Sequence, residues 1–355
     1  MKLHLTKIPS VVRRLRLPYE VEVSDCIVPE EGAVLVVEAL EDEGKNHLFE
    51  FTSGRVGDLV EGDILPVVLG KRRALREYSG DIPAHLAVGD LLYVLCGSGV
   101  VGEIRGVNEE WGVPMQVRVL GSVVAGGKQL NLKDAAIERQ HRLERSAPII
   151  GVVGTCMNIG KTTAICKLIK HFRRQDLKVA AVKLSGIASR YDPDKYSDAG
   201  ASPVLSFMDG GLPSTCGDAD TVVEVALGLL QEVNTRQPDL IIAEFGDSIL
   251  GEYHVEHMLR HADIQRHICS FIVATADFVA AWGARELMNQ YGIAITVITG
   301  PVANSDAAVL YIEKHLHIPA ESNQHEISKI IRLVEEHVRQ AQMQVVAEVN
   351  STPDR

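Results

Sequence analysis

Hydrophobic and polar positions divide the chain into two parts with different patterns. Between about residues 21 and 124, short apolar runs alternate with turns; the runs cover residues 33–40, 47–52, 63–69, 90–97 and 115–123. Repeated Gly-Asp pairs at 57–58, 62–63 and 89–90 mark these turns. The pattern predicts a small all-β domain over residues 1–130, built as a barrel or sandwich of about six or seven strands.

The pattern changes after a polar stretch at residues 131–147, which predicts a connecting helix that ends before Pro148. Residues 149–154 form an unbroken apolar run, typical of a parallel strand covered on both faces. Further strands are predicted at 178–184, 239–244, 270–275 and 294–299, with helices from Lys161, over 222–233 and between the later strands. This alternation predicts an α/β domain with a doubly wound, mostly parallel sheet over residues 148–345, followed by a disordered tail at 346–355.

Composition and charge restrict the classes of function. The 355 residues carry a formal net charge of −11, which argues against general binding to nucleic acid. No apolar run approaches the ~20 residues of a membrane span, and no secretory signal is indicated. The six cysteines form no Cys-x-x-Cys pair, so they indicate thiols in a reducing compartment. A soluble, cytoplasmic protein is therefore expected.

A glycine-rich segment, GVVGTCMNIGKTT at residues 151–163, lies where a predicted strand passes into a helix. In this context backbone N–H groups and a helix N-terminus bind phosphate oxygens. The segment predicts a phosphate loop (P-loop) in which Lys161 neutralises phosphate charge and the Thr162 hydroxyl binds Mg²⁺. The predicted nucleotide-binding residues in this loop are Gly154, Thr155, Asn158, Ile159, Gly160, Lys161, Thr162 and Thr163. No Asn-Lys-x-Asp motif that would recognise guanine follows the loop, so ATP is favoured.

Five residues separate the two glycines of the loop, one more than usual. With this spacing the segment resembles the loop of dethiobiotin synthetase and its relatives in the SIMIBI class of P-loop proteins. The likeness continues, in order, through residues 182–186, 197–199, 243–246 and 300–304. It implies that Asp198 binds magnesium and that Asn304 contacts the nucleotide base. Residues 183–186 and 245–247 depart from that family where it binds its diamine, and 198–207 also resembles the molybdopterin-guanine dinucleotide biosynthesis adaptor and two-domain P-loop acyltransferases.

The residues give a similar site independently. Glu244 ends an apolar strand, so its carboxylate is expected at the sheet edge beside the loop, where it would bind magnesium or act in catalysis. Asp198 is the other predicted magnesium ligand, with Asp192 and Asp194 as alternatives in the same polar loop. Lys183 is predicted to contact both the γ-phosphate and an anionic substrate. The remaining predicted substrate contacts are Ser185, Gly186, Asp247 and Ser248.

Three functions remain open. The first is an ATP-dependent ligase or kinase that activates a small anionic metabolite, with Lys161, Lys183 and Glu244 as catalytic residues. The second is a non-catalytic or slowly hydrolysing adaptor whose β domain binds a partner protein. The third, implied by the acyltransferase resemblance, is an N-acyltransferase whose P-loop holds coenzyme A. A homodimer is expected in each case.

Two further clusters have alternative interpretations. His254, His257 and His261 share a helical face, which indicates a metal site, a substrate contact or a solvated surface. The basic residues of the β domain indicate either an anion or partner contact or a solvated loop; they are Lys71, Arg72, Arg73 and Arg76.

Overall fold

The computed structural model describes residues 1–40, 48–74 and 77–351. This part of the chain divides into two compact units. We call residues 1–138, 186–191 and 207–222 the β unit, and residues 139–185, 192–206 and 223 onwards the P-loop unit. The division differs from the predicted one, because two segments from the second half of the sequence belong to the β unit.

The β unit is built mainly from one sheet with a small two-stranded sheet beside it. Its strands are β1 (Lys2–His4), β2 (Glu20–Ser24), β3 (Val34–Ala39), β4 (Leu48–Glu50), β5 (Val56–Asp58), β6 (Ile64–Leu69), β7 (Arg72–Arg73), β8 (Tyr78–Asp81), β9 (Leu91–Cys96), β10 (Val100–Val107), β11 (Gln116–Ala125) and β12 (Lys128–Gln129). Short 3₁₀ helices are η1 (Ser10–Leu15), η2 (Leu132–Ala135) and η3 (Phe207–Gly210).

Five of these strands close into a barrel. β3 pairs with β11 and β6, β6 with β10, β10 with β9, and β9 with β11, which completes the circle. Side chains of alternate residues on β3 face opposite ways: Leu35 and Val37 lie in one apolar cluster, whereas Val34 and Val36 lie in another. The period-2 pattern of a strand thus supplies two buried layers, and of the two predicted architectures the structure shows the barrel.

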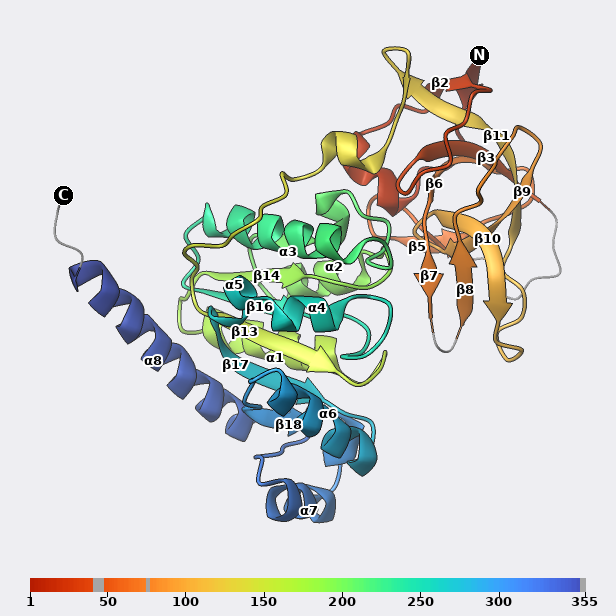
Figure 1. The fold of residues 1–355 in the computed structure, drawn as a ribbon. Helices are drawn as coiled ribbons and strands as arrows, with labels where there is room; N and C mark the ends of the chain where they lie inside the picture. The colour runs from red at the N-terminus through yellow and green to blue at the C-terminus, as the bar shows by residue number, and fades with distance from the viewer. Residues whose placement is uncertain (41–47, 75–76, 352–355) are drawn as a thin grey trace. The chain divides into compact units, whose positions relative to one another are not determined.

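The P-loop unit contains a six-stranded parallel sheet in the order β15-β14-β16-β13-β17-β18 (Figure 1). Its strands are β13 (Ile149–Gly154), β14 (Val179–Lys183), β15 (Val204–Ser206), β16 (Leu240–Glu244), β17 (Ile268–Ala274) and β18 (Val297–Thr299). Its helices are α1 (Lys161–Arg173), α2 (Tyr191–Asp198), α3 (Ala219–Asn234), α4 (Val255–Arg260), α5 (Ala262–Gln265), α6 (Phe278–Gln290), η4 (Pro301–Ala303), α7 (Asp306–Leu316) and α8 (Ser328–Ser351). Helices α2 and α3 begin within the β unit's segments.

Apolar side chains of α1 and α8 cover one face of this sheet. Ile165 and Leu168 of α1 and Ile330 of α8 share a buried cluster with Ile150 and Val152 of β13. The sheet is therefore buried as the apolar run at 149–154 predicts. Among the described residues, no helix combines the length and hydropathy needed to cross a bilayer.

Two predicted boundaries differ from the structure. The connecting helix predicted at 131–147 is limited to the four residues of η2, whose cap Asn131 accepts a hydrogen bond from the Lys133 N–H. The tail predicted to be disordered from 346 is helical through Ser351, as part of α8, and residues 352–355 lie outside the described chain.

Candidate functional site

The P-loop occupies residues 154–163, between the last residue of β13 and the first turn of α1. Asn158 and Gly160 adopt left-handed backbone conformations, with φ of 58° and 93°. A Cβ at Gly160 would lie 2.4 Å from the Asn323 amide nitrogen, which donates to the Gly160 carbonyl at 2.8 Å. Only glycine combines this φ with this close contact. Asn323 is fully buried and was not predicted, because no local pattern links it to a loop 163 residues away.

Neighbouring strands fix the remaining loop residues. The Thr155 N–H donates to the Ala274 carbonyl at 3.0 Å, and the Thr155 carbonyl accepts from the Ser248 hydroxyl at 3.0 Å. The Thr155 hydroxyl is buried and meets no partner within the described residues. Ile159 is buried, whereas Thr163 is exposed on α1. These contacts hold the loop in place between β13 and α1.

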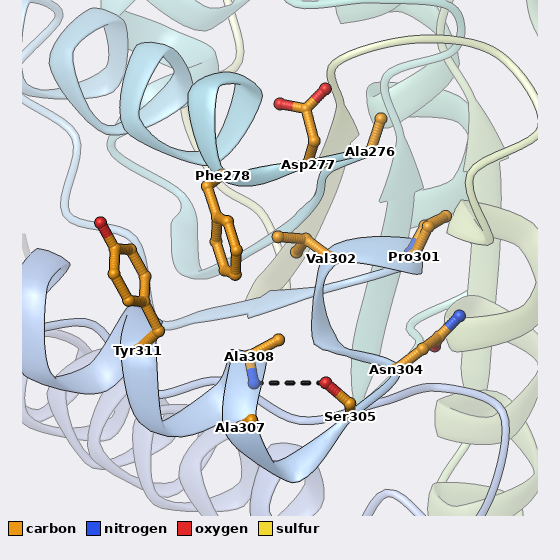
Figure 2. A pocket seen from close by; sticks show the side chains of 10 residues that line it. All are labelled: Ala276, Asp277, Phe278, Pro301, Val302, Asn304, Ser305, Ala307, Ala308 and Tyr311. Atoms are coloured by element: carbon orange, nitrogen blue, oxygen red, sulfur yellow. Dashed lines mark hydrogen bonds between the residues drawn. The ribbon is translucent and has the colours of Figure 1, made fainter.

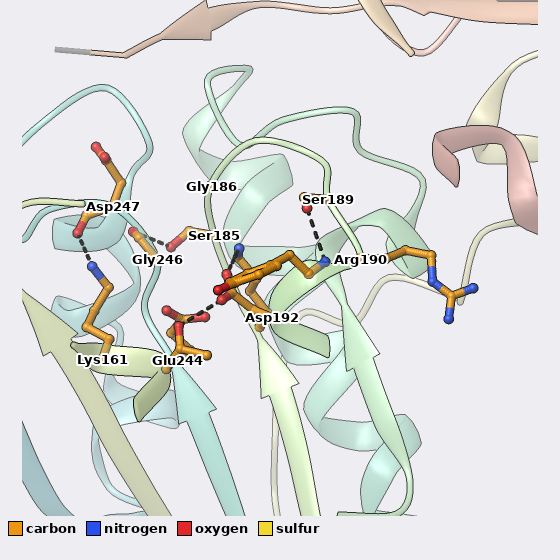
Figure 3. A network of polar contacts seen from close by, with 12 residues as sticks. Lys161, Ser185, Gly186, Ser189, Arg190, Asp192, Glu244, Gly246 and Asp247 are labelled. Carbon is orange, nitrogen blue, oxygen red and sulfur yellow. Dashed lines mark hydrogen bonds and ion pairs between the residues drawn. The ribbon is translucent and has the colours of Figure 1, made fainter. Parts of the chain in front are cut away.

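Lys161 lies in the first turn of α1 and is buried. Its ammonium group donates to the carbonyls of Cys156 and Asp247, both at 2.8 Å, and Figure 3 shows the contact with Asp247. Asp247 has a φ of 67°, so a strained turn after β16 presents this carbonyl. Burial lowers the pKa of Lys161, although the nearby Glu244 carboxylate acts in the opposite direction.

Asp192 contacts two of the predicted site residues, Thr162 and Lys183. Its carboxylate accepts from the Thr162 hydroxyl at 2.7 Å and from the Lys183 ammonium group at 2.5 Å. Burial raises the pKa of Asp192, but attraction to Lys183 and the hydrogen bonds from Lys183 and Thr162 outweigh it, so the pKa is lowered overall. Asp192 therefore remains an anion beside the Thr162 hydroxyl.

Glu244 lies next to this cluster at the end of β16, in register with Lys183 of β14. Its carboxylate is fully buried and accepts from the Tyr196 hydroxyl at 2.6 Å. Burial and repulsion from Asp192 raise the pKa of Glu244. Two carboxylates and one hydroxyl thus lie at the carboxyl edge of the sheet, and Figure 3 shows Glu244 and Asp192 together there. Oxygen ligands of this number suit Mg²⁺, which retains several waters.

Asp198, the predicted magnesium ligand, lies elsewhere. It is exposed at the last residue of α2, six residues after Asp192. Six residues place it about 9 Å further along the helix axis and on a different face. The sequence predicted a loop here; because the segment is a helix, the acid that contacts Thr162 is Asp192, the alternative that the sequence also offered.

The predicted substrate contacts have partners within the fold. The Ser185 hydroxyl donates to the Gly246 carbonyl at 3.1 Å, and the Gly186 N–H donates to the Thr215 hydroxyl at 3.1 Å. Ser248 donates to the P-loop, as described above, and the Asp247 carbonyl accepts from Lys161. These contacts shape the loops around the site, and they do not direct the Ser185 and Gly186 donors to a substrate.

A pocket of about 650 Å³ lies at the carboxyl ends of β17 and β18 (Figure 2). Asp277 and Phe278 line it from the β17 side, whereas Asn304 and Tyr311 line it from the segment after β18. Gly300, at the start of that segment, would place a Cβ 2.9 Å from the Ile159 carbonyl of the P-loop, so the two turns are in contact. Asn304, the predicted base contact, therefore lines a mainly apolar pocket beside the P-loop.

The two clusters with alternative interpretations are the basic residues of the β domain and the three histidines. Arg72 donates to Glu77 and to the Leu95 carbonyl, and Arg73 pairs with Asp81. Lys71 is half-buried, and Arg76 lies outside the described residues. Within the described residues no group of three or more His, Cys, Asp or Glu side chains is arranged to hold a metal, which includes His254, His257 and His261.

No family model and no curated protein matches this chain. Solved structures match part of it. Chloroplast FtsY from Physcomitrella patens is 17% identical over 54% of this chain and 62% of that chain, with a TM-score of 0.35. Signal recognition particle receptor FtsY from Elizabethkingia anophelis is 17% identical over 61% of this chain and 76% of that chain (TM-score 0.38), and the signal recognition particle 54 kDa protein from Aeropyrum pernix in complex with GDP is 16% identical over 58% of this chain and 49% of that chain (TM-score 0.37). The chain thus spans less than two thirds of the first of these. At these TM-scores we base no argument on the likeness, and the resemblance to dethiobiotin synthetase stays a prediction.

Proposed function

We propose that this protein is a Mg²⁺-dependent nucleoside-triphosphatase that binds ATP. The observation that carries the proposal is the arrangement of Lys161, Thr162, Asp192 and Glu244 around one glycine-rich loop at one sheet edge. The loop and the helix N-terminus provide backbone donors for phosphates, and Thr162 with Asp192 provides oxygen ligands for a hard cation beside Glu244.

Each residue has a definite task in this proposal. Lys161 places a positive charge at the loop, where it stabilises negative charge that develops on a transferred phosphoryl group. Thr162 and Asp192 hold the magnesium ion, and Glu244 orients a water or a metal-bound water from its buried position. Magnesium, when bound, supplies further charge neutralisation. Lys183 keeps Asp192 ionised and in place.

Hydrolysis is better supported than the ligase or kinase predicted from the sequence. Transfer to a metabolite requires donors that orient an anionic acceptor. Ser185 and Gly186 donate to groups of the fold, and Lys183 donates to Asp192. A water molecule needs no such acceptor site, so a slow triphosphatase, one form of the predicted adaptor, agrees best with these contacts.

We further propose that the pocket beside the P-loop holds the nucleotide base. Phe278 and Tyr311 lie with their ring centroids 4.6 Å apart at its wall, which provides an apolar surface for a planar ring. Asn304 and the exposed carboxylate of Asp277 supply polar groups at the same pocket. The lack of an Asn-Lys-x-Asp motif favours adenine, and a comparison of ATP with GTP tests this choice.

Equilibrium binding of ATP, GTP and acetyl-CoA, with magnesium and with EDTA, tests the proposal. Lys161→Ala should weaken ATP binding by about 10- to 150-fold, because a hydrogen bond to a charged group contributes about 1.5–3 kcal/mol. Lys170→Ala is the matched control, since Lys170 is an exposed lysine on the same helix. Equal affinities of both variants would refute the phosphate-loop assignment, and acetyl-CoA binding in place of ATP would favour the acyltransferase.

Phosphate release tests the magnesium side. Asp192→Asn should reduce magnesium-dependent release of phosphate at least 10-fold, as loss of a metal-site carboxylate commonly does. Asp198→Asn, the same change on the same helix, should leave the rate unchanged because Asp198 is exposed away from Thr162. The opposite result would restore the assignment made from the sequence.

A further inference from the structure

We propose that Glu50 of the β unit is a positioning residue for the magnesium site, because it holds the segment that carries Asp192. This inference rests on the proposed function. It gives the β unit a task that neither its sequence nor the comparisons indicate.

The contacts of Glu50 are directed at a segment from the second half of the chain. Glu50 is the last residue of β4 and is buried. Its two carboxylate oxygens accept from the Arg190 N–H at 2.9 and 3.0 Å, and one of them accepts from the Ser189 hydroxyl at 2.9 Å. The Ser10 hydroxyl also donates to this carboxylate. All of these residues belong to the β unit.

The segment at 186–191 is part of the β unit's core through other contacts as well. Ala188 is fully buried in an apolar cluster of that unit, and Ile187 packs against the same cluster. The Ala188 N–H donates to the Pro213 carbonyl at 3.0 Å, and the Cys96 thiol donates to the Ala188 carbonyl at 3.2 Å. The β unit therefore fixes the backbone up to Tyr191.

The chain passes into the P-loop unit at the next residue, Asp192, which contacts Thr162 and Lys183. Glu50 bonds the N–H of Arg190 immediately before α2, and the Ser189 hydroxyl accepts from the Tyr191 N–H at 3.1 Å. An anion at a helix N-terminus is favourable, and here it satisfies donors that the helix leaves without partners. Glu50 thus stabilises the backbone at the start of α2, one residue before Tyr191 and two before Asp192.

The same helix positions the second carboxylate of the site. Tyr196, four residues after Asp192, donates to Glu244. Residues four apart lie on one face of a helix, so a shift of α2 moves both contacts together.

The test compares two buried carboxylates of the β unit in the full-length chain. Glu50→Gln and Glu50→Ala are the test variants. Asp63→Ala is the control, because Asp63 is equally buried and accepts from Thr6, Lys7 and the Val60 N–H, all outside the segment at 186–191. All three variants should lower the melting temperature, so stability alone does not distinguish Glu50 from Asp63.

The deciding measurement is the magnesium concentration that supports half-maximal ATP binding. Loss of a residue that orients a metal ligand typically weakens metal affinity by about 10- to 100-fold, and we expect this for Glu50→Ala and Glu50→Gln. ATP binding in EDTA should be unchanged, and Asp63→Ala should retain the wild-type magnesium requirement. Glu50→Ala combined with Asp192→Asn should be no worse than Asp192→Asn alone. A wild-type magnesium requirement in both Glu50 variants would overturn the proposal.

Amide hydrogen exchange provides a second measurement that needs no nucleotide. The N–H groups of residues 190–198 should exchange faster in Glu50→Gln than in the wild type, and at the wild-type rate in Asp63→Ala. If the wild type binds no nucleotide, the proposed function fails, and exchange alone decides whether Glu50 positions α2. Unchanged exchange in Glu50→Gln would overturn the inference even if ATP binds as proposed.

Discussion

The hydrogen bond between Tyr196 and Glu244 allows a direct test of how the site is held. Tyr196→Phe removes a hydroxyl that lies 2.6 Å from a fully buried carboxylate and leaves the packing of the ring intact. A hydrogen bond to a charged group contributes about 1.5–3 kcal/mol, and the carboxylate that loses it remains buried. The unfolding equilibrium of the P-loop unit should therefore shift by about 10- to 150-fold, since about 1.4 kcal/mol corresponds to tenfold.

The matched control is Tyr78→Phe in the β unit. Tyr78 is also fully buried, but its hydroxyl meets no hydrogen-bond partner among the described residues. Removing a buried hydroxyl without a partner should leave stability unchanged or raise it. The same chemical change is thus expected to have opposite consequences at the two positions.

Urea unfolding followed by tryptophan fluorescence measures both variants. The chain has two tryptophans, Trp111 in the β unit and Trp282 in the P-loop unit. Trp111→Phe leaves Trp282 as the reporter for the Tyr196 variant, and Trp282→Phe leaves Trp111 for the Tyr78 variant. If Tyr196→Phe changes the free energy of unfolding no more than Tyr78→Phe does, the contact with Glu244 does not stabilise the site and the reasoning is wrong.

Three other predictions concern separate features of the fold. Gly300→Ala should destabilise the protein by more than about 1 kcal/mol, because its φ is 92° and the added Cβ would lie within 3.0 Å of two carbonyl oxygens. The control Gly283→Ala, inside α6 with open space around it, should stabilise the protein. Similar melting temperatures of the two variants would contradict this prediction. Burial raises the pKa of the half-buried Cys269 to about 12, so at about pH 8 iodoacetamide should label the exposed Cys26 well before Cys269. Equal labelling rates of the two thiols, read by mass spectrometry, would contradict this. The hydrogen bond from Lys329 lowers the pKa of Glu313, so this pair stabilises the fold above the unfolded pKa of Glu313, and the stabilisation disappears as the pH falls through the folded pKa. Glu313→Gln should therefore reduce the loss of unfolding free energy on the acid side, measured by urea titration, by at most about 1 kcal/mol. An unchanged pH dependence would argue against the pair.

Local patterns predicted the parts of the site that are contiguous in sequence. The apolar run at 149–154, the glycine at 160 and the lysine and threonine after it have a local physical cause, and the structure places them as a strand, a turn and a helix start. Glu244 was predicted to lie beside the loop because it ends a strand of apolar residues. A parallel sheet brings the carboxyl ends of β13 and β16 to the same edge.

Contacts between distant segments were not predictable in this way. Asn323 bonds the P-loop from the far end of the chain, and Glu50 bonds Arg190 across 140 residues. Neither residue lies in a pattern that distinguishes it from other asparagines and glutamates. The sequence favoured Asp198 over Asp192 for a related reason. The polar segment suggests a loop, but Pro193 lies in the first turn of α2, where proline is compatible with a helix.

Helix α2 accounts for two of these cases, the choice of Asp198 and the unpredicted contact of Glu50 with Arg190. A helix of eight residues is not stable by itself in water, so tertiary contacts must hold it. Those contacts are Glu50 before its first turn, Thr162 and Lys183 at Asp192, and Glu244 at Tyr196. Because Arg190 immediately precedes this helix, our proposal implies that a ligand that strengthens the contacts of Asp192 also favours the backbone conformation that Glu50 binds. Linkage is reciprocal, so under this proposal a substitution of Glu50 that releases Arg190 weakens that ligand by the same factor.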